Sequence, residues 1–137
     1  MDGVSTMRRP TPHDEAFGWW RVAIAGGDPE TTADPQCGFF KRRLVKGGPW
    51  VPARIWIDAE VCPETGELLS DERLQCEVNG AWADPDDAWS WICANPISEQ
   101  EFKYLTALAS HCAKHEPDHP AANPRKPIDH LSTPLHF

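Results

Sequence analysis

The residues best suited to bind a ligand lie in one stretch, residues 37–58, which reads CGFFKRRLVKGGPWVPARIWID. Basic and aromatic side chains are interleaved there, and no acid occurs before Asp58, although the chain carries a formal charge of −8. Clustered Lys and Arg attract anions, and aromatic rings among them stack on bases or anchor a protein partner. The stretch therefore predicts a surface that binds nucleic acid or a protein partner through Lys41, Arg42, Arg43, Lys46, Trp50, Arg54 and Trp56.

The spacing of these residues limits how many of them share a face. Residues 50–57 alternate with period two, which predicts a strand with one buried face and an outer face that carries Trp50, Arg54 and Trp56. By the same alternation, Lys41 and Arg43 should point to one face of their strand and Arg42 to the other. We expect a platform around Arg54 with only part of the KRR run beside it. The alternative is a solvated outer face in which Arg54 lies between Trp50 and Trp56 as a structural cation–π stack, while the other charges pair with acids elsewhere.

The charge changes sign after this stretch. From residue 58 to residue 101 there are twelve acids and one base, Arg73. Such an acidic field repels nucleic acid, binds a basic protein surface or imitates the phosphates of DNA, and ordinary solubility explains it equally well. The molecule is expected to be electrically bipolar. A protein–protein adaptor or inhibitor that uses the acidic surface or the tryptophans is therefore the alternative to a nucleic-acid-binding protein.

Signatures of metal binding and catalysis are weak. Residues of the types that bind zinc gather at one helix end (His111, Cys112, His115 and His119). Their spacing does not supply four ligands in a zinc-binding pattern. Three acids have the positions of a helix start rather than of a calcium loop (Asp84, Asp86 and Asp87). No phosphate loop, nucleophile elbow or dinucleotide fingerprint is present. We expect no enzyme, cofactor or metal, with a small zinc-dependent protein as a third alternative.

Length and composition favour one soluble domain. The 137 residues are 40% hydrophobic, which is enough for a single core. No apolar run reaches the roughly 18 to 20 residues of a membrane-spanning helix, and no signal peptide is recognisable, which favours the cytoplasm and no membrane partner. Five cysteines without a CxxC pair indicate reduced thiols. We expect most of the seven tryptophans to lie in the core.

The order of the elements follows from periodicity and turn residues. An apolar stripe predicts a helix over residues 12–25, with Phe17, Trp20 and Ile24 inward. Strands are predicted at 39–45, 50–57, 74–78 and 81–83, with an Asn79-Gly80 hairpin turn before the last. Pro52 indicates that the second strand has an edge or a bulge on one side. A short helix follows over 84–94, and a Ser98/Glu101 capping box begins a longer one that ends near residue 115.

These elements predict an α+β fold. It consists of an antiparallel β-meander of three or four strands, an N-terminal helix and a C-terminal helical pair that covers one sheet face. Residues 1–11 are expected to form a flexible arm, residues 12–115 the single α+β domain, and residues 116–137 a proline-rich tail that is apolar enough to dock on the body.

Several strings also resemble a known family: FGWWRVAIAG, GFFKRRLVKGGPWVPARIWI, PETGELL, ERLQCEVNG, NPISEQEFKYL and the terminal TPLHF. In this order, over nearly the whole chain, they are similar to a family of small uncharacterised proteins encoded by bacteriophages and prophages of proteobacteria. The resemblance implies a context rather than a chemistry, because such accessory proteins serve phage DNA replication, recombination or packaging, or block host defence. We therefore expect a non-enzymatic phage-type accessory protein in the host cytoplasm that binds nucleic acid or, alternatively, inhibits a host defence or DNA-processing enzyme.

Overall fold

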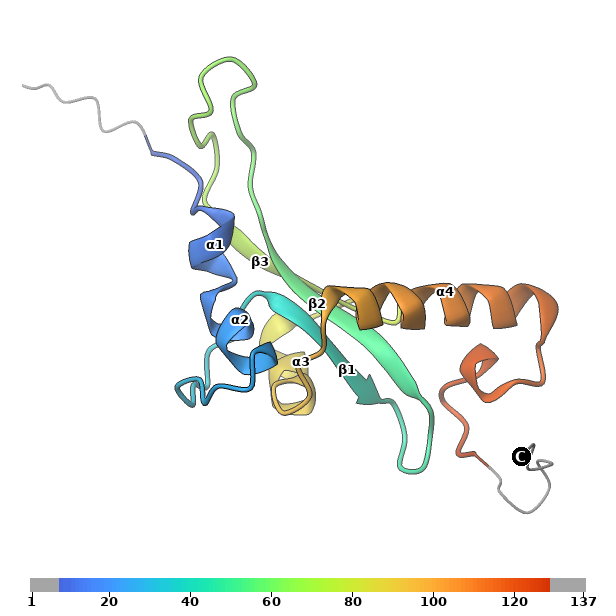
Figure 1. Cartoon of the computed structure of the whole chain (residues 1–137). Coiled ribbons are helices and arrows are strands. Elements are labelled where there is room, and N and C mark those ends of the chain that lie inside the picture. Colours follow the sequence, from blue (N-terminus) through green and yellow to red (C-terminus); the bar gives the residue numbers. More distant parts are fainter. Residues whose placement is uncertain (1–7, 129–137) are drawn as a thin grey trace, which may run out of the picture.

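Four antiparallel strands form the centre of the molecule in the computed structural model, which describes residues 8–128 (Figure 1). Their spatial order is their chain order: β1 (Gly38–Arg43), β2 (Trp50–Asp58), β3 (Arg73–Val78) and β4 (Ala81–Ala83). The helices are α1 (His13–Ala16), α2 (Gly18–Ile24), α3 (Pro85–Ile92), α4 (Glu99–His115) and the 3₁₀ turn η1 (Pro120–Ala122). The predicted α+β meander is confirmed. None of the described helices is long and apolar enough to cross a bilayer.

Local chemistry sets the boundaries of the later elements. Asn79-Gly80 joins β3 to β4 with φ values of 53° and 82°, the left-handed pair that a two-residue hairpin turn requires. The Asp84 carboxylate accepts the N–H of Asp86 at 2.9 Å and begins α3. The Ser98 hydroxyl accepts the N–H of Glu101 at 3.0 Å and begins α4. Both predicted helix caps are confirmed.

The single helix expected over residues 12–25 is instead two short helices. They meet at Phe17, whose φ of −97° and ψ of 12° interrupt the helical backbone. Phe17 is buried against Trp20 and Phe39, with ring centroids 6.1 and 6.2 Å away, and Gly18 after it is a poor helix former. Ile24, expected inward, is 41% exposed because the apolar stripe ends at Trp20.

The main core lies on one face of the sheet. Odd-numbered residues of β2 point to it, as predicted, with Val51, Ala53 and Ile55 at most 3% exposed. Phe40 from β1 lies beside them, and Trp89 of α3 packs edge-on against its ring at 5.6 Å. Of the seven tryptophans, only Trp20 and Trp89 are buried, so the expectation that most of them lie in the core is wrong.

The two C-terminal helices lie on opposite faces of the sheet rather than together on one (Figure 1). Phe40 contacts α3, whereas its neighbour Phe39 contacts Phe102 of α4 at 4.9 Å, and adjacent strand residues point to opposite faces. The chain between the helices runs along the edge of β1, where the Lys41 N–H donates to Asn95 and the Ile97 N–H to Phe39, both at 3.0 Å. Covering that edge takes the chain from one face to the other.

Strand β2 is a central strand despite Pro52. The Pro52 carbonyl accepts the N–H of Asn79 at 2.7 Å, so the missing N–H of the proline faces the turn beyond the end of β3. The ladder to β1 therefore loses nothing, and the edge or bulge expected at this position is absent from the described strand.

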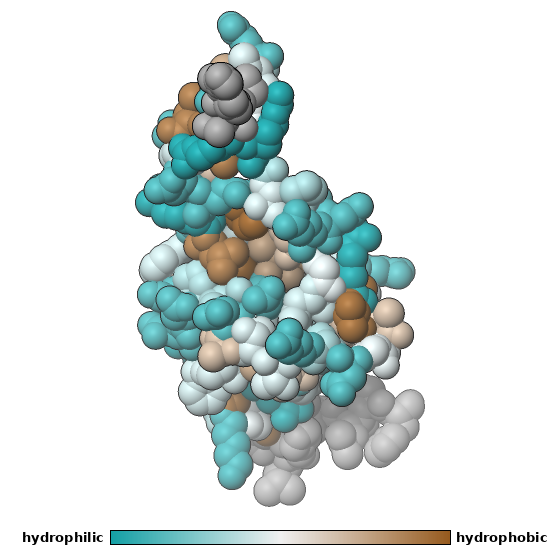
Figure 2. Space-filling model, turned by 90° about the vertical axis from the view of Figure 1, so that its left-hand side faces the viewer, coloured by the Kyte–Doolittle hydropathy of each residue, from teal (hydrophilic) through white to brown (hydrophobic). Residues whose placement is uncertain are grey.

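The connection between β2 and β3 projects from the body as a long hairpin (Figures 1 and 2). A Val61–Leu68 bridge pairs its two sides, and the N-terminal segment lies along it, since the Leu68 N–H donates to the Arg8 carbonyl at 2.8 Å. Figure 2 looks onto the side of α1 and α2 and shows hydrophobic atoms on this hairpin among hydrophilic ones, where Leu69 is exposed.

Candidate nucleic-acid interface

The predicted basic and aromatic residues divide between the two faces of the sheet. Lys41 pairs with Pro52 and Arg43 with Trp50 across β1 and β2, which places them on the α4 face with Arg54 and Trp56. Arg42 points to the α3 face. The alternation predicted from the sequence is therefore confirmed, and the seven residues do not form one continuous patch.

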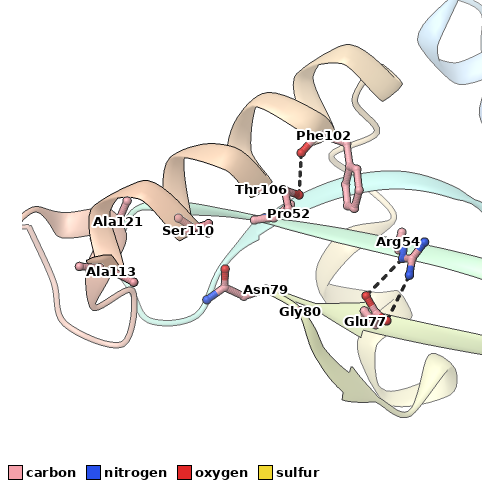
Figure 3. A pocket seen from close by; sticks show the side chains of 12 residues that line it. Pro52, Arg54, Glu77, Asn79, Gly80, Phe102, Thr106, Ser110, Ala113 and Ala121 are labelled. Atoms are coloured by element: carbon pink, nitrogen blue, oxygen red, sulfur yellow. Dashed lines mark hydrogen bonds and ion pairs between the residues drawn. The ribbon is translucent and has the colours of Figure 1, made fainter. Parts of the chain in front are cut away.

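Two of the predicted cations have carboxylate partners. Lys41 Nζ lies 3.1 Å from Glu101 Oε2 of α4. Arg54 donates through Nε and Nη2 to the two oxygens of Glu77 on β3, each at 3.2 Å, in the forked geometry that suits guanidinium and carboxylate (Figure 3). Both pairs are partly buried and join neighbouring elements. Lys41 and Arg54 are accordingly bridging residues rather than free anion-binding groups.

The predicted tryptophans are stacked with the protein's own cations. The Arg43 guanidinium lies 4.5 Å and the Lys41 ammonium 4.8 Å from the Trp50 ring centroid. The Arg54 guanidinium lies 4.3 Å from the Trp56 ring centroid. Each such contact contributes about 0.5–1 kcal/mol at an exposed site. Cation–π stacking is thus present at both rings, but Arg54 stacks on Trp56 alone and not between Trp50 and Trp56 as the sequence-based alternative had it.

Arg42 has a different environment on the α3 face. Its guanidinium lies 5.0 Å from the ring centroid of Trp91, which is 62% exposed on α3. Burial lowers the pKa of Arg42, and the nearby charge of Arg125 lowers that pKa further. Arginine nevertheless stays protonated at neutral pH. The two guanidinium groups therefore carry like charges that act on each other and are not neutralised by each other.

Arg125 reaches this place because the chain after α4 returns across the end of the sheet (Figure 1). Pro124 is buried, and the Ile128 N–H donates to the carbonyl of Gly47 in the β1–β2 turn at 2.8 Å. Gly48 in the same turn leaves room for the returning chain, since a Cβ there would lie 3.1 Å from the Pro124 carbonyl oxygen. Residues 123–128 are thereby fixed beside the turn.

We call the resulting surface the basic end, defined by Arg42, Arg43, Lys46, Arg125 and Lys126. Residues 41–48 and 123–128 contain no acid, and within residues 8–128 none of these five cations pairs with a carboxylate. Sequence reasoning missed Arg125, Lys126 and Trp91. Arg125 and Lys126 gave only a weak signal because they lie in a proline-rich connection. Trp91 is two residues from the buried Trp89, a spacing that points it outward on a helix and could have been used.

A cavity of about 530 Å³ lies at the basic end on the α3 face. Its walls come from β1, β4, α3 and the returning segment, and they include Arg42, Arg125, Trp91, Trp82 and Asp87. A second cavity, of about 460 Å³, lies between α4 and the other sheet face and is lined mainly by small residues and Phe102 (Figure 3). The first holds unpaired charge, whereas in the second the Arg54 charge is matched by Glu77.

Acids gather at the opposite end. The projecting hairpin, residues 58–72, holds six acids and no base, and we call it the acidic hairpin (Asp58, Glu60, Glu64, Glu67, Asp71 and Glu72). Cations from the N-terminal segment lie against it, with Arg8 2.8 Å from Asp71 and Arg9 donating to the Thr65 carbonyl at 2.8 Å. Strand β2, which joins the two ends, is about 25 Å long at roughly 3.3 Å per residue.

The residues considered for zinc do not converge. His111 and His115 have ring centroids 5.0 Å apart, but Cys112 between them is fully buried with the pKa of its thiol raised by burial. His119 accepts the Ala121 N–H through Nδ1 and caps η1. Within residues 8–128, no three side chains of the metal-binding types gather at one point.

Comparisons with protein-family models, curated proteins and solved structures give no match for this chain.

Proposed function

We propose that this chain is a non-enzymatic, phage-type accessory protein that binds nucleic acid through its basic end. The observation that carries the proposal is the convergence of two distant segments, the β1–β2 turn and residues 123–128, which adds cations to cations because neither segment contains an acid. Lys and Arg release counterions when they contact phosphates, and that release drives nucleic-acid binding. The acidic hairpin at the far end repels the same polyanion and orients it toward the basic end.

The residues proposed to contact phosphates differ from those proposed from the sequence. Arg42, Arg43 and Lys46 are retained, and Arg125 and Lys126 are added. Lys41 and Arg54 contribute little because their charges are matched by Glu101 and Glu77. Trp50 supports the surface by holding Arg43, and Trp56 lies away from it beside Arg54.

Fluorescence anisotropy with labelled DNA tests the proposal. Five phosphate contacts on a single strand predict that log K falls with log salt concentration with a slope of about −3.5, at roughly −0.7 per contact. Arg54→Gln, which removes a cation whose charge is already matched by Glu77, should change affinity less than about twofold and serves as the control. Binding that ignores salt, or no binding at micromolar protein, contradicts the proposal.

A protein–protein adaptor or inhibitor is the second candidate. Three large aromatic side chains favour it, because Trp82, Trp91 and Tyr104 are all more than 60% exposed and aromatic residues are common interface anchors. A stoichiometric protein partner retained from host lysate after nuclease treatment, together with no affinity for DNA, would favour the adaptor over the nucleic-acid-binding protein.

A further inference from the structure

The cavity at the basic end has the size of a small-ligand site and walls of opposite character. Its volume of about 530 Å³ lies in the range typical of ligand pockets, roughly 300 to 1,000 Å³. Arg42 and Arg125 form one side. Asp84 and Asp87, at the start of α3, form another, with Trp91 one helical turn beyond. A ligand that matches these walls carries an anion, a planar ring and a hydrogen-bond donor.

The two arginines fit a phosphate. They share one cavity, neither pairs with a carboxylate within residues 8–128, and the charge of Arg125 lowers the pKa of Arg42. Like charges so close repel each other, and an anion between them removes that repulsion. Guanidinium groups bind phosphate oxygens through paired N–H donors, which gives geometric fit as well as charge.

Trp91 fits a base. Arg42 covers one face of its ring at 5.0 Å, and the side chain as a whole is 62% exposed. A base stacked on the exposed part of this ring would complete a stack of guanidinium, indole and base, and base–aromatic stacking raises affinity about fivefold or more. A base within a duplex is already paired and stacked, so this contact favours a single strand.

Asp87 fits an amino group on that base. One oxygen of the Asp84 carboxylate accepts the Asp86 N–H, whereas Asp87 has neither a capping role nor an ion pair among the described residues. Carboxylates accept hydrogen bonds from the N4 amino group of cytosine, while thymine presents a carbonyl oxygen at the same position. The acidic wall would therefore favour cytosine over thymine.

We propose that this cavity binds one nucleotide of a single-stranded nucleic acid, with the phosphate between Arg42 and Arg125, the base on Trp91 and an amino-bearing base edge toward Asp87. The inference rests on the proposed function and adds to it the strand type and the base preference. The nucleotide is held by the cavity, and the remaining cations of the basic end contact the neighbouring phosphates.

Anisotropy with labelled (dC)10 and (dT)10 and the full chain tests the inference. We expect (dC)10 to bind more tightly than (dT)10 and more tightly than a duplex of the same length. Trp91→Ala should weaken binding at least about fivefold, the lower end of the stacking range, and Trp91→Phe should weaken it less. Tyr104→Ala is the matched control, because Tyr104 is equally exposed but lies outside the cavity, and it should have no effect.

Two further variants separate the walls of the cavity. Asp87→Asn should reduce the preference for (dC)10 over (dT)10, and Arg42→Gln with Arg125→Gln should weaken both oligonucleotides equally. Equal binding of the two oligonucleotides combined with no effect of Trp91→Ala overturns the inference and leaves the proposed function standing. Displacement of (dC)10 by a ten-residue polyglutamate at equal concentration overturns it in favour of an acidic peptide. No binding of either oligonucleotide overturns the function itself.

Discussion

The two ends of the sheet are built alike and charged differently. At each end a strand connection holds a segment from near a chain terminus through a backbone hydrogen bond of 2.8 Å: Leu68 to Arg8 at the acidic hairpin, and Ile128 to Gly47 at the basic end. At the acidic hairpin the added segment brings arginines, and Arg8 pairs with Asp71. At the basic end it brings Arg125 and Lys126 to a surface that is already basic. The added segment offsets part of the charge at one end and increases it at the other.

This difference in charge indicates which end of the sheet needs a binding partner. A surface whose added segment carries the opposite charge is partly neutralised within the chain. Where the added segment increases like charge, the cations repel each other. An anion that binds there removes this repulsion and so lowers the free energy. The hairpin acids also serve the fold, since the Glu72 carboxylate accepts both the N–H and the hydroxyl of Thr11 at 2.9 Å.

The largest expected effect comes from the core on which both ends depend. Phe40 is fully buried between Trp19 and Trp89, and Phe40→Ala should lower the free energy of unfolding by about 3–5 kcal/mol. Urea denaturation measures this change. Tyr104→Ala, at an exposed aromatic, should cost far less. Near-equal losses for the two variants would show that the core is elsewhere.

Local features of the fold could be predicted from the sequence, whereas only the part of the site that lies in residues 42–46 could. Asn79-Gly80 and the Ser98/Glu101 box act over two to four residues, and period two fixed which β2 side chains are buried. The Lys41–Glu101 pair spans sixty positions, and nothing local indicates it. The return of residues 123–128 to Gly47 depends on tertiary packing, so the sequence did not show that Arg125 joins Arg42.

A second prediction concerns the acidic hairpin. Hydrogen bonds from the Thr65 hydroxyl and from the Thr65 and Glu64 amides lower the pKa of Cys62, whereas burial raises the pKa values of Cys37 and Cys76 to about 11. The thiolate is the reactive form, so near neutral pH iodoacetamide should modify Cys62 roughly ten times faster than either buried thiol, or more. Peptide mapping measures the rates.

The pH dependence of this reaction provides its control. Thr65→Val removes the hydroxyl that donates to Cys62, which raises the pKa of that thiol toward its usual value. The rate should then reach its plateau at a higher pH than in the unaltered chain. An unchanged pH profile in Thr65→Val would contradict the assignment of the lowered pKa to this hydrogen bond.

A smaller effect should follow when a matched charge at the α4 face is released. Glu101→Gln leaves Lys41 without its carboxylate and makes a sixth cation available beside the basic end. DNA affinity should rise by up to about fivefold, because a partly exposed ion pair such as this one contributes up to about 1 kcal/mol. Glu99→Gln, which breaks the Lys103 pair on the same turn of α4, is the control of equal charge. Equal gains from both variants would attribute the effect to net charge alone.

The smallest effect is expected from the hairpin acids themselves. Replacing Glu60, Glu64 and Glu67 by Gln should change DNA affinity by less than about twofold at 0.15 M salt, because the ends lie roughly 25 Å apart and the screening length is about 8 Å. At 0.01 M salt, where that length is about 30 Å, the triple variant should bind measurably more tightly. A large gain at high salt would mean that the acids act at short range.

The most direct test compares two triple variants that change the net charge equally. The first replaces Arg43, Lys46 and Lys126 at the basic end by Gln, and the second replaces Arg21, Arg73 and Lys103 elsewhere by Gln. In salt-dependent DNA binding, the first should reduce the slope of log K against log salt from about −3.5 to about −1.5, while the second leaves it nearly unchanged. Equal slopes for the two variants would contradict the account, because binding would then depend on total charge and not on the basic end.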